Sequence, residues 1–213
     1  FVSGGSEAVE SAVKLARQYV YAKGENSRSK IISRRPSYHG ATLGALALTA
    51  YEPLNAPFRD MTMDMPHIPA DMLEEKILEE GAENILGFIM EPVGGASTGA
   101  LVAPDSYYKR IRDICDQYGV LLIYDEVMTG VGRTGKFLAC EHWNINPDII
   151  ATAKGFGAGY IPLGAMTARD EIVETVLDSG GFQHGYTYAG NPIACAAGLA
   201  VIDEIYSNNL MEN

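Results

Sequence analysis

The chain alternates short apolar runs with amphipathic segments, and this alternation restricts the fold more than any other feature of the sequence. The apolar runs predict buried strands at residues 30–33, 84–91, 120–126, 149–151 and 163–168. The segments between them predict helices at residues 6–24, 40–50, 71–81, 105–119 and from Pro192 onward. Strands that alternate with helices form a mostly parallel sheet with helices on both faces. The sequence therefore predicts an α/β fold with such a sheet.

Length and composition predict one large domain. The chain has 213 residues, of which 47% are hydrophobic and 20% charged, enough apolar content for one core. Its net charge of -11 comes from carboxylates scattered along the chain, so we expect no nucleic-acid partner. No apolar run is long enough to span a membrane, and we expect no membrane partner.

The three cysteines, Cys115, Cys140 and Cys195, lie far apart in the sequence and form neither a disulfide framework nor a metal-binding spacing. Such usage is typical of a reducing environment, so we expect a cytoplasmic protein. The first residues, "FVSGGSEAVES", predict a strand end and a glycine turn, and the last residues stop soon after a helix. We therefore expect the chain to be part of a longer protein.

Charged residues follow three of the predicted strands. Glu91, Asp125 and Lys154 each come where an apolar run ends. The carboxyl ends of parallel strands meet at one sheet edge, where open α/β sheets bind their ligands. Taken singly, a lysine is normally solvated and an aspartate after a strand is commonly a turn or cap residue. Glu126, beside Asp125, is expected to be structural.

The residues at this edge of the sheet indicate two chemistries. The paired acids at 125 and 126 could at most give a magnesium ion hard oxygen ligands, since no histidine lies at ligand spacing around them, and we expect no metal site. A lysine that can form an imine and an acid that can keep a ring nitrogen protonated are the pair that pyridoxal phosphate requires. The sequence contains both halves of that pair in Lys154 and Asp125.

A phosphorylated cofactor also needs an anion site, and "SGGSEAVES" offers one before the clearest predicted helix. Gly5 lets the backbone approach closely, and the helix amides with the Ser6 hydroxyl would bind the phosphate. Ser6 as a plain N-cap is the alternative. Tyr38, in "SYHG", would stack on a pyridine ring or pack in the core.

Six segments occur in the order typical of one family: "SGGSEAVESAVKLAR", "SYHG", "EPVGG", "IYDEVMTGVGRTG", "ATAKGFGAGYIPLGA" and "HGYTYAGNPIACAA". Together they resemble the class III aminotransferases over essentially the whole chain. The resemblance implies the fold-type-I, pyridoxal-phosphate-binding large domain over residues 1–213, without the usual N-terminal segment and C-terminal small domain. It also implies a homodimer with shared active sites.

The resemblance implies a role for each matching residue. Lys154 would bind pyridoxal 5'-phosphate as an internal aldimine and move the substrate proton, while Asp125 would pair with the pyridinium nitrogen. Val127 and Tyr38 would lie against the two faces of the ring. The remaining cofactor contacts would come from Gly5, Ser6, Glu91 and, across the dimer interface, Thr187. We expect His39 and Arg133 to be structural residues.

The resemblance also implies the reaction, in which an amino group moves from an amino acid or amine donor to a 2-keto acid acceptor. Met128 and Ala96 stand where ornithine and 4-aminobutyrate aminotransferases typically carry glutamine and glutamate, so the pattern is closer to ω-amino acid:pyruvate aminotransferases. An isomerase on the same fold, an aminomutase or amino-acid racemase, is an alternative reading. A truncated, inactive fragment or a non-catalytic oligomerisation module is another.

Overall fold

The computed structural model describes residues 1–212 and is built on one six-stranded sheet with the order β2-β1-β3-β4-β5-β6. Neighbouring strands pair in parallel from β2 to β5, and β6 pairs antiparallel with β5. The predicted α/β fold with a mostly parallel sheet is confirmed. The strands are β1 (Lys30–Arg34), β2 (His67–Ile68), β3 (Ile85–Met90), β4 (Leu121–Asp125), β5 (Ile149–Thr152) and β6 (Ala165–Ala168).

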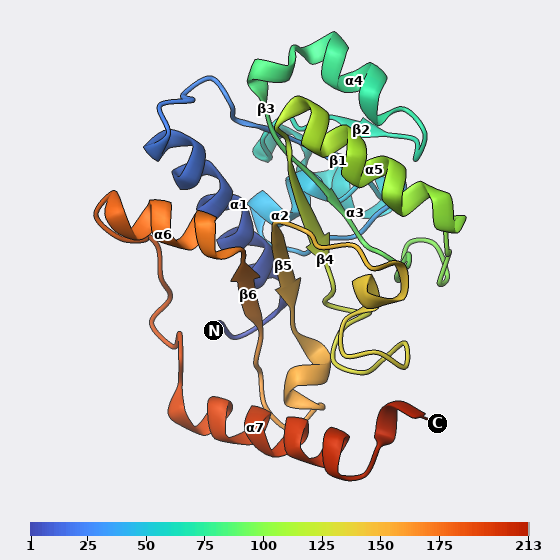
Figure 1. Cartoon of the computed structure of the whole chain (residues 1–213), viewed down its shortest axis with the longest axis vertical. Coiled ribbons are helices and arrows are strands. Elements are labelled where there is room, and N and C mark those ends of the chain that lie inside the picture. Colours follow the sequence, from blue (N-terminus) through green and yellow to red (C-terminus); the bar gives the residue numbers. More distant parts are fainter. Residues whose placement is uncertain (213) are drawn as a thin grey trace.

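Helices cover both faces of the sheet (Figure 1). One hydrophobic core joins α1, α2 and α6 to one face, and a second joins α4 and α5 to the other. α7 lies across the carboxyl ends of the central strands. The helices are α1 (Gly5–Ala22), α2 (Leu43–Leu48), α3 (Glu52–Asn55), α4 (Leu73–Glu80), α5 (Asp105–Tyr118), α6 (Asp170–Asp178) and α7 (Pro192–Ser207).

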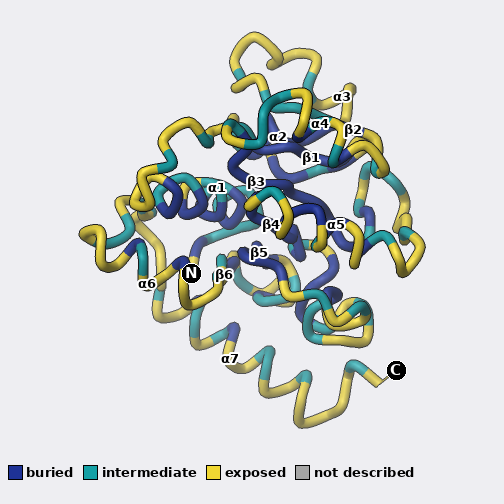
Figure 2. Tube along the Cα trace, turned by 45° about the horizontal axis from the view of Figure 1, so that its top comes forward, coloured by how far each residue is buried: buried dark blue, intermediate teal, exposed yellow. Residues whose placement is uncertain are grey.

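The central strands are buried on both faces because alternate side chains enter different cores. In β3 every residue is buried; Ile89 packs in the first core and Phe88 in the second. Figure 2 shows these strands as a buried layer, with α7 exposed along most of its length. Within residues 1–212 no helix is long and apolar enough to cross a membrane.

Two strands differ from the sequence prediction. β6 runs antiparallel to β5 because a loop with one short 3-10 helix, Lys154–Gly157, connects them, and an antiparallel neighbour needs no long crossover. β2 has only two residues, too few to show a periodicity. The predicted strand positions at 30–33, 84–91 and 120–126 agree with β1, β3 and β4.

Candidate active site

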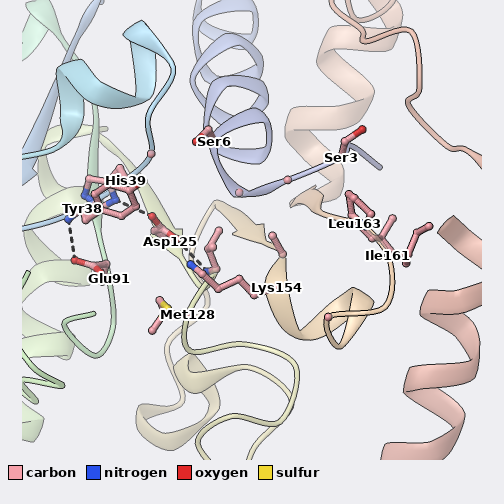
Figure 3. Close-up of a pocket in the computed structure, with 17 residues that line it drawn as sticks. Ser3, Ser6, Tyr38, His39, Glu91, Asp125, Met128, Lys154, Ile161 and Leu163 are labelled. Carbon is pink, nitrogen blue, oxygen red and sulfur yellow. Dashed lines mark hydrogen bonds and ion pairs between the residues drawn. The ribbon is translucent and has the colours of Figure 1, made fainter. Parts of the chain in front are cut away.

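A cavity of about 470 Å³ opens at the carboxyl ends of β3, β4 and β5 and at the N-terminus of α1 (Figure 3). Seven of the residues that the sequence analysis singled out line it: Gly5, Ser6, Tyr38, Glu91, Asp125, Val127 and Lys154. A wall of apolar residues that the sequence analysis did not single out, including Ile161 and Leu163, completes the cavity. The topology thus brings together residues that are far apart in the chain.

Asp125 is the last residue of β4 and is 4% exposed. Its Oδ1 accepts a hydrogen bond from the backbone N–H of Val127 at 3.0 Å. Its Oδ2 accepts a hydrogen bond from His39 Nδ1 at 2.8 Å. These two donors fix the orientation of a carboxylate that lines the cavity.

His39 also lies on the cavity wall, although the sequence analysis assigned it only a structural role. It is 1% exposed, and Thr49 Oγ1 accepts a hydrogen bond from its backbone N–H at 2.9 Å. Among the described residues its Nε2 has no partner, although the atom is buried. The only sequence signal was its place beside Tyr38, because its partner Asp125 lies 86 residues further along the chain.

Glu91 directly follows β3 and is 2% exposed. Its carboxylate accepts hydrogen bonds from the backbone N–H of Tyr38 at 3.3 Å and of Gly95 at 2.9 Å. Burial raises the pKa of Glu91 above its ordinary value, and the nearby carboxylate of Asp125 adds to this effect. Glu91 therefore fixes the backbone beside Tyr38, a supporting role.

Lys154 begins the 3-10 helix that follows β5, and its side chain is exposed toward the cavity. Its φ is +42°, a left-handed conformation that side chains other than glycine rarely adopt. The next residue, Gly155, is so close to Val131 that an added Cβ would lie 2.8 Å from the valine Cβ. The turn that presents the amine is thus tightly defined.

The N-terminus of α1 faces the same cavity. Its N-cap residue is Gly4, so no N-cap side chain occupies the first backbone amides of the helix. Only glycine fits at position 5, since a Cβ there would lie 2.8 Å from Val127 Cγ1. The alternative reading of Ser6 as the N-cap is wrong, because Ser6 lies within the helix. Its Oγ instead accepts a hydrogen bond from the Ala41 N–H at 3.0 Å.

Thr187 and Arg133 lie away from this cavity. Thr187 is exposed on the loop between α6 and α7 and does not line the cavity, so its assignment to a partner's site stays a prediction. Arg133 lines a neighbouring cavity of about 1000 Å³ beside α7, which Lys154 also borders. Among the described residues there is no cluster of three or more metal-ligating side chains.

The donor set fits a phosphorylated pyridine aldehyde. A helix N-terminus with a required glycine provides an anion site, an oriented buried carboxylate lies across the cavity, and an accessible amine lies between them. Residues 1–213 match the family model for class III aminotransferases along their whole length. The chain belongs to the class III aminotransferase family. Solved relatives of the family include an amine transaminase from an uncultivated Pseudomonas species in the pyridoxal-phosphate-bound form.

Two curated relatives of this class III chain are also named as aminotransferases. An uncharacterized aminotransferase, YodT of Bacillus subtilis, is 39% identical over 232 residues, covering 100% of this chain and 52% of the relative. A probable aminotransferase of Mycobacterium tuberculosis, Rv3329, is 42% identical over 224 residues, covering 95% and 48%. The chain thus spans about half the length of these relatives.

Solved transaminases share the fold closely. A transaminase from the marine bacterium Virgibacillus has a TM-score of 0.96 and 38% identity, covering 99% of this chain and 50% of its own. An (S)-enantioselective omega-transaminase from Thermomicrobium roseum has a TM-score of 0.95 and 40% identity, covering 99% and 52%. The predicted large-domain fold is confirmed by these structures.

Proposed function

We propose that the whole protein is a pyridoxal-phosphate-dependent aminotransferase and that residues 1–213 form its cofactor-binding large domain. The observation that carries the proposal is the placement of Lys154 and Asp125 at the ends of adjacent strands, in one cavity with the N-terminus of α1. The activity is the transfer of an amino group from an amino acid or amine donor to a 2-keto acid. Family membership and the match to solved transaminases support it.

Asp125 and Lys154 divide the proton chemistry. The cofactor, when bound, supplies a ring that withdraws electrons from the substrate Cα. Asp125 would hold a proton at the ring nitrogen, and its hydrogen bonds with Val127 N and His39 Nδ1 keep its carboxylate oriented. The Lys154 amine would hold the cofactor and then, as a free base, would take the proton from the substrate Cα and deliver it to the cofactor carbon that receives the nitrogen.

The other residues that line the cavity would bind the cofactor phosphate and orient the cofactor ring. The backbone amides at Gly5 and Ser6 would bind the phosphate at the positive end of α1. Ser6 Oγ already accepts the Ala41 N–H, which leaves its own hydrogen free to donate to the phosphate. Tyr38 and Val127, which line the cavity, would contact the ring, and Glu91 fixes the backbone of Tyr38.

Lys154 is tested by chemical trapping in the full-length protein. Borohydride reduction should attach the cofactor covalently to Lys154, as read by peptide mapping, and Lys154→Ala should abolish the attachment. Lys136, an exposed lysine outside the cavity, is the matched control: Lys136→Ala should leave labelling unchanged. Adduct found on any other lysine would refute the assignment.

An amine donor without a keto acid should release one carbonyl product per site, whereas an isomerase would release none.

We further propose a cytoplasmic homodimer with shared sites, small-molecule substrates, and no nucleic-acid or membrane partner. The exposure of Thr187 outside the cavity supports a role toward a second subunit. The net charge of -11 supports the absence of nucleic acid, and the three free cysteines support a reducing compartment.

The shared site is tested by mixing full-length subunits that carry Lys154→Ala and Thr187→Ala. In the heterodimer, the site with the intact lysine receives its threonine from the Lys154→Ala partner, so its cofactor affinity should equal that of the wild type. The Thr187→Ala homodimer should bind more weakly by about 1–3 kcal/mol, the contribution of a hydrogen bond to a charged group. Equal weakening in both dimers would show that Thr187 acts within its own chain.

For the substrate, we propose a range resembling that of ω-amino acid:pyruvate aminotransferases. Met128 is 39% exposed and lines the cavity, which supports an apolar substrate contact at the position where ornithine-type enzymes carry a glutamine. Ala96, without a carboxylate, lies in the loop after Glu91. Solved relatives described as omega-transaminases agree with this proposal.

A further inference from the structure

Glu10 lies one turn after Ser6 on α1 and makes contacts that the proposed chemistry does not use. Its Oε1 accepts hydrogen bonds from Thr42 Oγ1 at 2.6 Å, from Gly44 N at 3.0 Å and from Ala45 N at 3.2 Å. These donors lie at the beginning of α2, where the Thr42 N-cap makes no cap bond with its own side chain. Glu10 therefore caps α2 from a neighbouring helix.

The segment that Glu10 holds leads directly from two residues of the cavity. Tyr38 and His39 precede α2, and both line the cavity with Ser6 (Figure 3). At Gly40 an added Cβ would lie 2.6 Å from Ser6 Oγ, so this segment and α1 are in close contact. Ser6 and Glu10 thus hold this segment against α1 at two points: Ser6 accepts the Ala41 N–H, and Glu10 accepts the Gly44 N–H.

We propose that Glu10 is a positioning residue of the cofactor site: its carboxylate holds the segment 38–45 against α1 and so sets the positions of Tyr38 and His39. The inference rests on the proposed function for its effect on the cofactor. A charged acceptor with three donors forms stronger hydrogen bonds than a neutral one. Displacing the segment would move the Tyr38 ring and the imidazole that orients Asp125.

Amide hydrogen exchange in the cofactor-free chain tests the coupling first. Glu10→Gln keeps the size of the side chain and removes its charge. We expect exchange to become about tenfold faster at Gly44 and Ala45, and also at His39 and Ala41, whose own acceptors are unchanged. The matched control is Glu141→Gln, since Glu141 is exposed and accepts the Leu138 N–H at 2.7 Å, away from the cavity. Faster exchange at Gly44 and Ala45 alone would mean a local helix cap and overturn the proposal.

Gly44→Ala tests the same contact from the other side. A Cβ at Gly44 would lie 2.7 Å from Glu10 Oε1, so the flexible carboxylate must move away. Alanine favours a helix over glycine, so propensity alone predicts slower exchange in α2. The proposal instead predicts faster exchange at His39 and Ala41, and slower exchange there would overturn it.

Cofactor affinity in the full-length protein completes the test. Glu10→Gln should raise the dissociation constant of pyridoxal phosphate about tenfold, because hydrogen bonds to a neutral acceptor are weaker than those to a charged one, while Glu141→Gln leaves it unchanged. If the wild type binds pyridoxal phosphate and Glu10→Gln has the same dissociation constant, this inference is overturned and the proposed function stays intact. A wild-type protein that does not bind pyridoxal phosphate overturns the proposed function, and hydrogen exchange then still decides whether Glu10 holds the segment.

Discussion

At the scale of single residues, the hydrogen bonds of Asp125 explain how a carboxylate at the end of a strand becomes a directed group. Each oxygen has one protein donor, so the remaining lone pairs are available toward the cavity. Because Asp125 Oδ2 accepts the bond, the His39 ring carries a hydrogen on Nδ1. Among residues 1–212, the buried Nε2 of His39 has no hydrogen-bond partner.

We expect Asp125→Asn to slow the first half-reaction of the full-length protein by about a hundredfold or more, because a neutral amide does not hold the ring nitrogen protonated. Single-turnover absorbance changes on adding an amine donor measure this rate. Asp113→Asn is the control, since Asp113 is exposed and its ion pair within the described residues is with Lys109 on the surface of α5. A near-normal rate in Asp125→Asn would contradict the role of the carboxylate.

The residues that follow strands were the predictable part of this cavity. Glu91, Asp125 and Lys154 could be placed together because parallel strands end at one edge. The partner of Ser6 is 35 residues away and that of His39 is 86 residues away. Contacts over such distances depend on how helices pack on the sheet, and no local pattern encodes them.

At the scale of elements, Glu126 joins the end of β4 to the 3-10 helix Ala139–Trp143. Its buried carboxylate accepts hydrogen bonds from Ala139 N at 3.0 Å and Cys140 N at 2.8 Å, and a third from Thr129 Oγ1. Burial raises its pKa, and these donors oppose that effect. The expectation that Glu126 is structural agrees with these contacts, which shape the loop beside Val127.

Glu126→Ala should lower the free energy of unfolding by about 2–5 kcal/mol, because it leaves buried donors without an acceptor. Chemical denaturation followed by circular dichroism measures the change. Glu126→Gln, which keeps one acceptor oxygen, should lose less. Glu141→Ala is the exposed control and should change stability by less than about 1 kcal/mol. An equal loss in the two alanine variants would show that burial of Glu126 is not what matters.

Elements with long, regular patterns were predictable, whereas short or unpatterned ones were not. β3 and α1 follow from an apolar run and a helical period. α6 was not predicted. Its buried apolar residues Ile172 and Val176 share one face, but the segment follows a strand whose direction the sequence does not define. The direction of β6 depended on the length of the connection after Lys154, which only the fold defines.

At the scale of the whole molecule, His67 makes stability depend on pH. It lies on the edge strand β2, with its Nδ1 2.6 Å from Ser33 Oγ. Burial lowers its pKa to about 4, helped by the charges of Arg35 and His39 and opposed by Asp64. Between pH 6.5 and about 4 the unfolded chain therefore binds a proton that the folded chain does not.

The contribution of His67 to the free energy of unfolding should accordingly be lost as the pH drops from 6.5 to about 4, by up to about 3 kcal/mol, and be fully retained above pH 6.5. Urea unfolding at a series of pH values measures the slope. His67→Gln should flatten this part of the profile, whereas His142→Gln, at an exposed position, should keep the wild-type slope. A profile unchanged by His67→Gln would rule out His67 as its source.

The left-handed backbone conformation at Lys154 has a consequence for redesigning this chain for higher stability. A non-glycine residue at φ +42° destabilises the fold by about 1–3 kcal/mol, and glycine or asparagine would relieve that strain. A search for thermostable sequences guided only by backbone preference would therefore replace Lys154 among its first choices. With Lys154 in its proposed role, such variants would fold well but lack aminotransferase activity, so the backbone strain at this position would be a cost of the proposed reaction.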